Sequence, residues 1–202
     1  MPLSALSLLG SKIKHALGFS ARDPRSHRIV AVIECILNQN ARDRGAATYR
    51  AINHAVLQLC QKHEVGVLQI ACPEMQFLGL RRQRPARVTL RGCLDTSAGQ
   101  QCCQRISHEL ADRFEDYIKN GCQIVAILGG NPESPGCAIH HQKTCKGEKT
   151  LADNSGILML TLHVELRKRG LDIPFVAVRD HRPELLSEDL VTVETLFRAS
   201  RR

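Results

Sequence analysis

A chain of 202 residues, 43% of them hydrophobic, is long enough to bury a core of its own, and it carries a formal charge of +8. No apolar run approaches the roughly 18 to 20 residues that a membrane-spanning helix needs, which excludes an integral membrane protein of the helical class. Five Phe, two Tyr and no Trp provide few of the stacking surfaces that proteins binding single-stranded nucleic acid use.

Nine cysteines lie in a chain whose Leu-rich start lacks the basic region of a secretory signal, so we expect a cytoplasmic protein. An odd number of cysteines in such a compartment disfavours a disulfide framework. Metal ligation, an iron–sulfur cluster or catalytic thiols are the remaining uses.

Residues 1–27 are predicted to form an N-terminal extension to a single domain over residues 28–202. Apolar residues recur in the extension at helical spacing: Leu6, Leu9, Ile13 and Leu17. This pattern indicates an amphipathic helix or a flexible segment. The helix could cap the domain, or as a basic amphipathic helix it could lie on a membrane surface.

Strand-like and helix-like segments alternate along the rest of the chain. The expected strands are short apolar runs at residues 28–34, 65–70, 123–128 and 173–178. The expected helices cover residues 46–62, 97–120, 155–169 and 187–199. An Arg-dense irregular connection is expected at residues 75–95, and a polar loop over the strand ends at residues 138–153. The alternation predicts an α/β fold of three-layer, Rossmann-like type, with a parallel sheet and helices on both faces.

Three of the expected strands lead towards a cysteine at their carboxyl ends. Cys35 follows the first strand, Cys72 follows the second directly before Pro73, and Cys137 follows a Gly-rich loop after the third. Because proline lacks the N–H that a sheet ladder needs, the second strand is expected to end at Cys72. Ligands of open α/β sheets bind beyond the carboxyl ends of the strands. The three thiols are therefore predicted to face one crevice.

The wide spacing of these cysteines limits the kind of metal site that they can form. Positions 35, 72 and 137 are 37 and 65 residues apart, unlike the closely paired ligands of a zinc ribbon or knuckle. Soft thiolate ligands suit zinc or an iron–sulfur cluster. Three thiolates on a four-iron cluster would leave one iron without a protein ligand and open to substrate.

The residues around the cysteines form three short motifs. They are Cys35-Ile36-Leu37-Asn38 with Arg42 and Gly45 downstream, Cys72-Pro73-Glu74 with Arg84-Pro85 downstream, and Ser134-Pro135-Gly136-Cys137. Over roughly residues 28–180 the chain resembles the thiouracil desulfidase family, also called the thiouracil desulfurase-like proteins. The resemblance implies that Cys35, Cys72 and Cys137 hold a [4Fe-4S] cluster, with Glu74 and Ser134 beside it. It also implies that the open iron binds the sulfur of a thiolated base and removes it.

The loops around the motifs depart from the family pattern, and these loops are expected to shape the substrate pocket. Asn38 stands where the family usually has Gly, Asp43-Arg44 replaces Tyr-Asp, and Phe77-Leu78-Gly79-Leu80 replaces Gly-Gly-Leu. The chain therefore resembles a divergent member acting on a thiolated nucleobase, nucleotide or similar small molecule of its own. The candidate substrate contacts are Asn38, Arg42, Arg82 and Arg84.

The position of Glu74, two residues after a predicted cluster ligand, suggests that it transfers protons in the same crevice. The alternative is that it accepts backbone hydrogen bonds after Pro73 and only holds the turn. Ser134 is the second residue that we expect to take part in catalysis, from its place in the third motif.

Other functions are compatible with the same residues. The three cysteines could hold zinc or form a reversible disulfide in a non-catalytic redox module. The arginines of residues 81–91 could bind a nucleotide phosphate or a tRNA backbone, or they could form an ordinary solvated surface. His140, His141 and Cys145 could bind a metal of their own, or lie in a solvated loop.

Overall fold

The computed structural model describes residues 23–145, 147 and 149–200, so most of the predicted extension at residues 1–27 lies outside the described residues. Four parallel strands form the main sheet in the order β2-β1-β3-β6. They are β1 (Arg28–Ile33), β2 (Gly66–Ile70), β3 (Gln123–Gly129) and β6 (Phe175–Ala177). The predicted α/β, Rossmann-like fold with a parallel sheet is confirmed.

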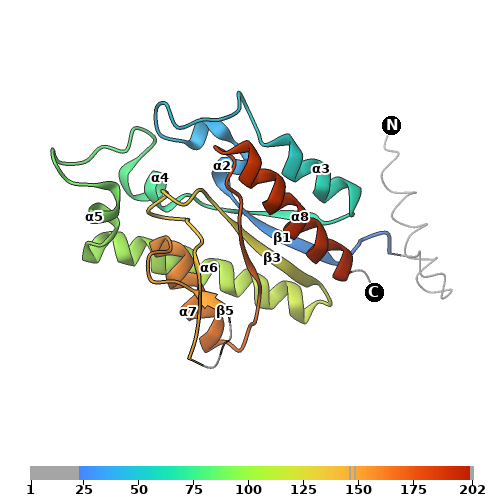
Figure 1. Ribbon diagram of the computed structural model, residues 1–202. Coiled ribbons are helices and arrows are strands. Elements are labelled where there is room, and N and C mark those ends of the chain that lie inside the picture. Colours follow the sequence, from blue (N-terminus) through green and yellow to red (C-terminus); the bar gives the residue numbers. More distant parts are fainter. Residues whose placement is uncertain (1–22, 146, 148, 201–202) are drawn as a thin grey trace, which may run out of the picture.

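Two helices cover each face of this sheet (Figure 1). One pair is α3 (His54–Lys62) and α8 (Pro183–Ala199), which pack against each other, and the other is α6 (Ser97–Lys119) and α7 (Ile157–Lys168). Residues Val30–Ile33 of β1 and Ile124–Leu128 of β3 are almost fully buried, because helices remove both faces of the central strands from water.

Short helical elements occupy the carboxyl ends of the strands. They are α2 (Glu34–Leu37), the 3₁₀ turn η1 (Gln39–Ala41), α4 (Pro73–Leu78) and α5 (Leu90–Leu94). The strand β2 ends at Ile70, and Pro73 occupies the first turn of α4, where its missing N–H costs no hydrogen bond. The Arg-dense connection, expected to be irregular, therefore contains α4 in part and α5 as a whole.

Two other sequence-based boundaries were wrong. The helix expected from residue 46 begins at His54, because the Asn53 side chain caps it by accepting a hydrogen bond of 3.3 Å from the Val56 amide. The last helix, expected from residue 187, begins at Pro183, a residue that fits the first helical turn.

The polar segment at residues 138–153 does not cover the strand ends as expected. It contains an antiparallel hairpin of β4 (His141–Lys143) and β5 (Lys149–Leu151). The hairpin lies beside α7, where Thr150 Oγ1 is 3.3 Å from His163 Nε2. Within the described part of the chain, no helix is long and apolar enough to cross a membrane.

Candidate functional site

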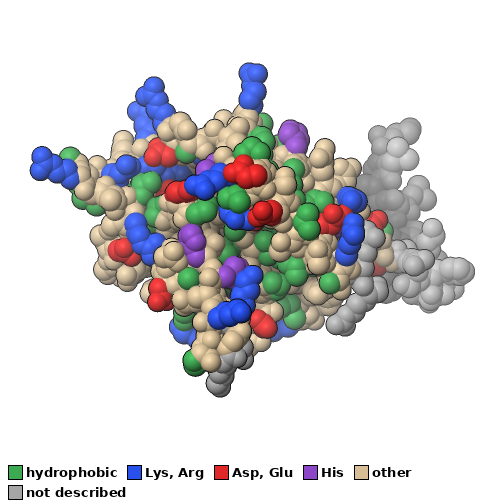
Figure 2. Space-filling view, in the orientation of Figure 1, with side chains coloured by type: hydrophobic (Ala, Val, Ile, Leu, Met, Phe, Trp, Pro, Cys, Tyr) green, Lys and Arg blue, Asp and Glu red, His purple; other side chains and the backbone are tan. Residues whose placement is uncertain are grey.

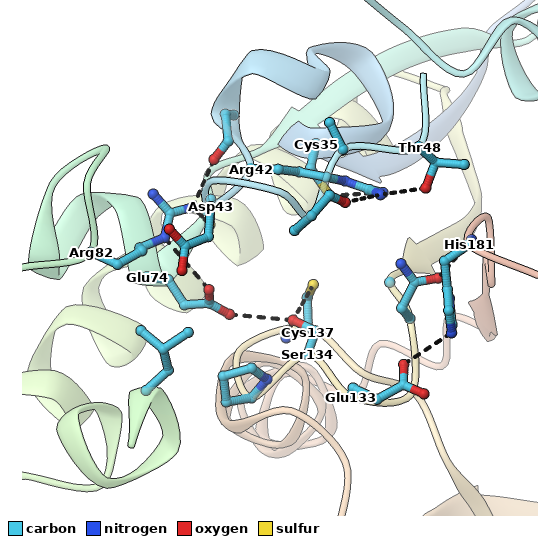
Figure 3. Close-up of a pocket in the computed structure, with 18 of the residues that line it drawn as sticks. Cys35, Arg42, Asp43, Thr48, Glu74, Arg82, Glu133, Ser134, Cys137 and His181 are labelled. Atoms are coloured by element: carbon cyan, nitrogen blue, oxygen red, sulfur yellow. Dashed lines mark hydrogen bonds and ion pairs between the residues drawn. The ribbon is translucent and has the colours of Figure 1, made fainter. Parts of the chain in front are cut away.

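A cavity of about 580 Å³ lies at the carboxyl ends of the parallel strands (Figure 3). The three cysteines of the sequence motifs all line it, together with Glu74 and Ser134. Each cysteine comes from the segment after a different strand, so the sheet brings together residues that are far apart in the sequence. The predicted convergence of Cys35, Cys72 and Cys137 on one crevice is present in the structure.

Local structure fixes the first two cysteines relative to each other. Cys35 lies in α2, directly after β1, and Cys72 lies between β2 and α4. The backbone N–H of Cys72 donates a hydrogen bond of 2.9 Å to the Glu34 carboxylate, which is buried. Glu34 therefore ties the second motif to the first, a role that the sequence analysis did not assign.

Close backbone packing holds the third cysteine. Cys137 is buried, and its carbonyl accepts a hydrogen bond of 2.8 Å from the Gly130 amide. A Cβ atom built on Gly156 would lie 2.4 Å from the Cys137 nitrogen, nearer than any side chain can pack. The start of α7 can approach the third motif this closely only because residue 156 has no side chain.

Each cysteine sulfur has a polar side chain beside it. Arg42 Nη2 lies 3.7 Å from the Cys35 sulfur, and Arg82 Nη2 lies 3.5 Å from the Cys72 sulfur. Ser134 Oγ lies 3.1 Å from the Cys137 sulfur and also accepts a hydrogen bond from the Cys137 amide. Two guanidinium groups and a hydroxyl can thus compensate negative charge on the sulfurs.

Glu74 is nearly buried and points into the same cavity, as Figure 3 shows. Ser134 donates a hydrogen bond of 3.3 Å to Glu74 Oε1, while Arg82 Nε lies 3.6 Å from Oε2. Glu74 is therefore oriented by side chains from two other loops, in addition to its own helix α4.

Burial raises the pKa of all three thiols. It is the largest cause at each site, and at Cys72 it raises the pKa to about 11, with a further contribution from the Glu74 charge. The pKa of Cys137 is raised well above its usual range by burial and then by the charge of Cys35. The pKa of Cys35 is raised by burial, which the nearby Arg42 partly opposes. Burial therefore favours the neutral thiol at each of the three positions unless a bound cation compensates the charge of the thiolate.

The fourth strand also supplies residues to this region, which the sequence analysis missed. Asp180 follows β6, and its buried carboxylate accepts hydrogen bonds of 2.8 and 2.7 Å from Arg42 Nη2. His181 lines the cavity with its Nε2 3.3 Å from Glu133 Oε2. Because all four carboxyl ends meet at one edge, the position of residues 180 and 181 after a predicted strand was the signal that could have found them.

The structure divides the four candidate substrate contacts into two pairs. Arg42 and Arg82 line the cavity, but both are largely buried and bonded to protein groups. Asn38 is exposed, does not line the cavity and caps η1 by accepting from the Asn40 amide. Arg84 is also exposed and outside the cavity, and it donates to the backbone carbonyls of Arg82 and Val88.

The three cysteine sulfurs are soft ligands of the kind that zinc or an iron–sulfur cluster takes. Among residues 23–145, 147 and 149–200, no group of three or more His, Cys, Asp or Glu side chains is arranged to hold a metal ion. Before the hairpin, His140 contacts the Pro132 carbonyl at 3.1 Å. The thiolates of a cluster bind different irons, so they need not converge on one point.

Comparison with known proteins gives a distant relative. The chain is 24% identical over 149 residues to the uncharacterized protein MJ0003 of Methanocaldococcus jannaschii, covering 74% of this chain and 84% of that protein. No protein-family model matches the chain. No solved structure matches it either.

Proposed function

We propose that this protein is an iron–sulfur-dependent desulfidase, which removes sulfur from a thiolated nucleobase, nucleotide or similar small molecule. The observation that supports it is the shared cavity, in which three cysteines from three strand ends lie with a nearly buried carboxylate and a serine hydroxyl. Convergent thiols and a positioned carboxylate in one concave site are typical of an active site.

In this proposal Cys35, Cys72 and Cys137 hold a [4Fe-4S] cluster, which when bound supplies a Lewis-acidic iron for the sulfur of the substrate. The guanidinium groups of Arg42 and Arg82 would stabilise the thiolates of Cys35 and Cys72 from the protein side, through the contacts at 3.7 and 3.5 Å.

The protein side chains manage the water and its proton. The oxygen of a water molecule forms a bond to the thiolated carbon, the carbon–sulfur bond breaks, and the sulfur leaves as hydrosulfide. Glu74 accepts one proton of the water, and the other proton leaves with the sulfur in the hydrosulfide. Ser134 orients Glu74 through the hydrogen bond to Oε1, and Arg82 compensates the charge of the carboxylate.

Purification without oxygen tests the proposal directly. Protein purified and reconstituted with iron and sulfide is expected to contain about four irons and to show the broad visible absorption of a cluster. Incubation with a thiolated base should then release hydrosulfide and yield the oxo base. A protein that holds zinc, or that holds iron but releases no hydrosulfide from any thiolated base or nucleotide, would contradict the proposed function.

Exposed arginines near the cavity favour an anionic group on the substrate or on a second partner such as tRNA. On the loop before α3 and the loop between α4 and α5, four exposed arginines have side chains with no hydrogen bond or ion pair in the described structure: Arg44, Arg50, Arg81 and Arg87. Both loops also line the cavity. Figure 2 shows Lys and Arg side chains projecting over this end of the molecule. These four arginines would bind a phosphate group.

A further inference from the structure

We propose that Asp180 is a positioning residue of the candidate site. It holds Arg42 against the Cys35 sulfur, and it ties together the loops that follow β1, β3 and β6. The inference rests on the proposed function in one respect, since it takes Cys35 as a cluster ligand.

The Asp180 carboxylate is fully buried, and four hydrogen bonds surround it. Arg42 Nη2 lies 2.8 and 2.7 Å from its two oxygens. Asn131 Nδ2 donates to Oδ1 at 3.1 Å, and Gln39 Nε2 donates to Oδ2 at 3.3 Å. Asp180 does not line the cavity, and its oxygens are engaged by protein groups. Its role is therefore exerted through the residues that it holds.

Arg42 is the residue that carries the effect of Asp180 to the cysteines. Its other terminal nitrogen, Nη1, donates to the Ala46 carbonyl and to Thr48 Oγ1, both at 3.1 Å. With both nitrogens of the planar guanidinium engaged, Nη2 is fixed 3.7 Å from the Cys35 sulfur. Hydrogen bonds and positive charge at a ligand sulfur raise the reduction potential of a cluster.

Asp180 also connects the loops that carry two of the cysteines. Gln39 Nε2 donates a hydrogen bond of 2.7 Å to the Cys35 carbonyl and one of 3.3 Å to Asp180 Oδ2. Asn131 lies on the loop that leads to Cys137, and its Oδ1 accepts from the His181 amide at 3.5 Å. One buried carboxylate thus joins the first motif, the third motif and the segment after β6.

A neighbouring ion pair provides a matched control. Asp189 is buried and accepts hydrogen bonds from the backbone and the guanidinium of Arg179, one residue before Asp180. Neither Asp189 nor Arg179 lines the cavity. Asp180→Asn and Asp189→Asn therefore remove the same charge from two buried carboxylates, each paired with an arginine, and only the first pair contacts the cysteine loops.

The test measures the midpoint potential of the cluster in reconstituted wild type, Asp180→Asn, Asp189→Asn and Arg42→Lys. If Asp180 positions Arg42, Asp180→Asn frees the guanidinium and lowers the potential. Arg42→Lys keeps the positive charge but loses the planar guanidinium, so it lowers the potential too. Asp189→Asn has the same potential as the wild type. A raised potential in Asp180→Asn would mean that Arg42 stays in place and that Asp180 acts on the cluster only through its charge. An unchanged potential would mean that Asp180 has no influence on the cluster. Either result overturns the inference.

Hydrogen exchange of the iron-free proteins separates this inference from the proposed function. Asp180→Asn is expected to speed exchange at residues 39–48 and 131–137 by at least about tenfold, as for the loss of about one hydrogen bond. Asp189→Asn should leave these segments unchanged. If the wild type binds no iron, the cluster proposal fails while the exchange comparison still decides whether Asp180 ties the loops. Equal exchange rates in Asp180→Asn and the wild type would overturn the inference that Asp180 ties the loops together.

Discussion

Arg82 Nη2 lies 3.5 Å from the Cys72 sulfur, and the Arg82 side chain is only 2% exposed. The same nitrogen donates to the Ala41 carbonyl at 2.7 Å, and Nε faces the Glu74 carboxylate. Arg82, which the sequence makes a candidate substrate contact, is thus part of the wall around the cysteines. Its removal should affect the cavity itself.

Arg82→Gln is therefore expected to destabilise the protein by on the order of 3 kcal/mol, because it leaves Glu74 nearly buried without its cation. Chemical denaturation of the iron-free protein measures this loss. Arg84→Gln is the control, since Arg84 is exposed and contacts only backbone carbonyls. Equal stability of the two variants would show that the contacts of Arg82 contribute little.

Serine replacements test the proposed cluster ligands. Cys35→Ser, Cys72→Ser and Cys137→Ser should each abolish iron binding, measured by metal analysis and visible absorption. Cys145→Ser changes an exposed thiol and Cys60→Ser a buried one outside the cavity, and both should keep the full iron content. A full iron complement in any of the first three would show that the ligand set is wrong.

Glu74→Gln tests the proton acceptor. The variant should keep its iron and its visible spectrum, since the amide retains the shape of the side chain, but lose about a hundredfold in turnover. Glu133→Gln is the matched control variant, because Glu133 also lines the cavity but contacts His181 instead of Ser134. Near-normal turnover in Glu74→Gln would limit Glu74 to holding the loop.

Charge reversal on the exposed loop tests the phosphate contact. Arg81 and Arg87 lie outside the cavity, on the loop between α4 and α5. Arg81→Glu with Arg87→Glu should raise the Michaelis constant for a thiolated nucleotide and leave that for the free base unchanged, since only the nucleotide carries phosphate. Affinity for the nucleotide should also fall with added salt in the wild type. A similar loss for both substrates would argue against a phosphate contact.

Acid stability should depend on the contact between α3 and α8. Hydrogen bonds from Lys62, then His63 and Arg198, lower the pKa of Glu194 to about 2. A carboxyl whose pKa is lowered on folding stabilises the protein above its unfolded pKa of about 4.3. This contribution is lost as the pH falls from about 4 to about 2. Glu194→Gln should therefore lose stability at neutral pH and show a shallower decline over that window, measured by thermal unfolding.

The parallel sheet and the convergence of the cysteines could be predicted because they follow from local patterns. Apolar runs give the strands, and the rule that ligands bind beyond the carboxyl ends of parallel strands places Cys35, Cys72 and Cys137 at one edge. No distance between the loops was needed for that inference.

The partners of the cysteines could not be predicted, because they depend on tertiary contacts. Nothing in the local sequence shows that Arg82 turns inward while Arg84 stays exposed, two residues away. The pairing of Arg42 with Asp180 joins positions 138 residues apart. The start of α3 was misplaced because the apolar residues before Asn53 continue the helical period without forming a helix.

The strand order has a consequence for how the cavity forms during synthesis. The central strands β1 and β3 pair with β2 and β6 at the two edges, and the wall of the cavity runs from Cys35 to His181. Parallel pairing over such separations forms late in folding, because long loops must close before the contacts are gained. A ribosome-bound chain that has not yet released β6 lacks the carboxylate that holds Arg42. If the protein holds the proposed cluster, iron is therefore expected to bind only after the domain is complete.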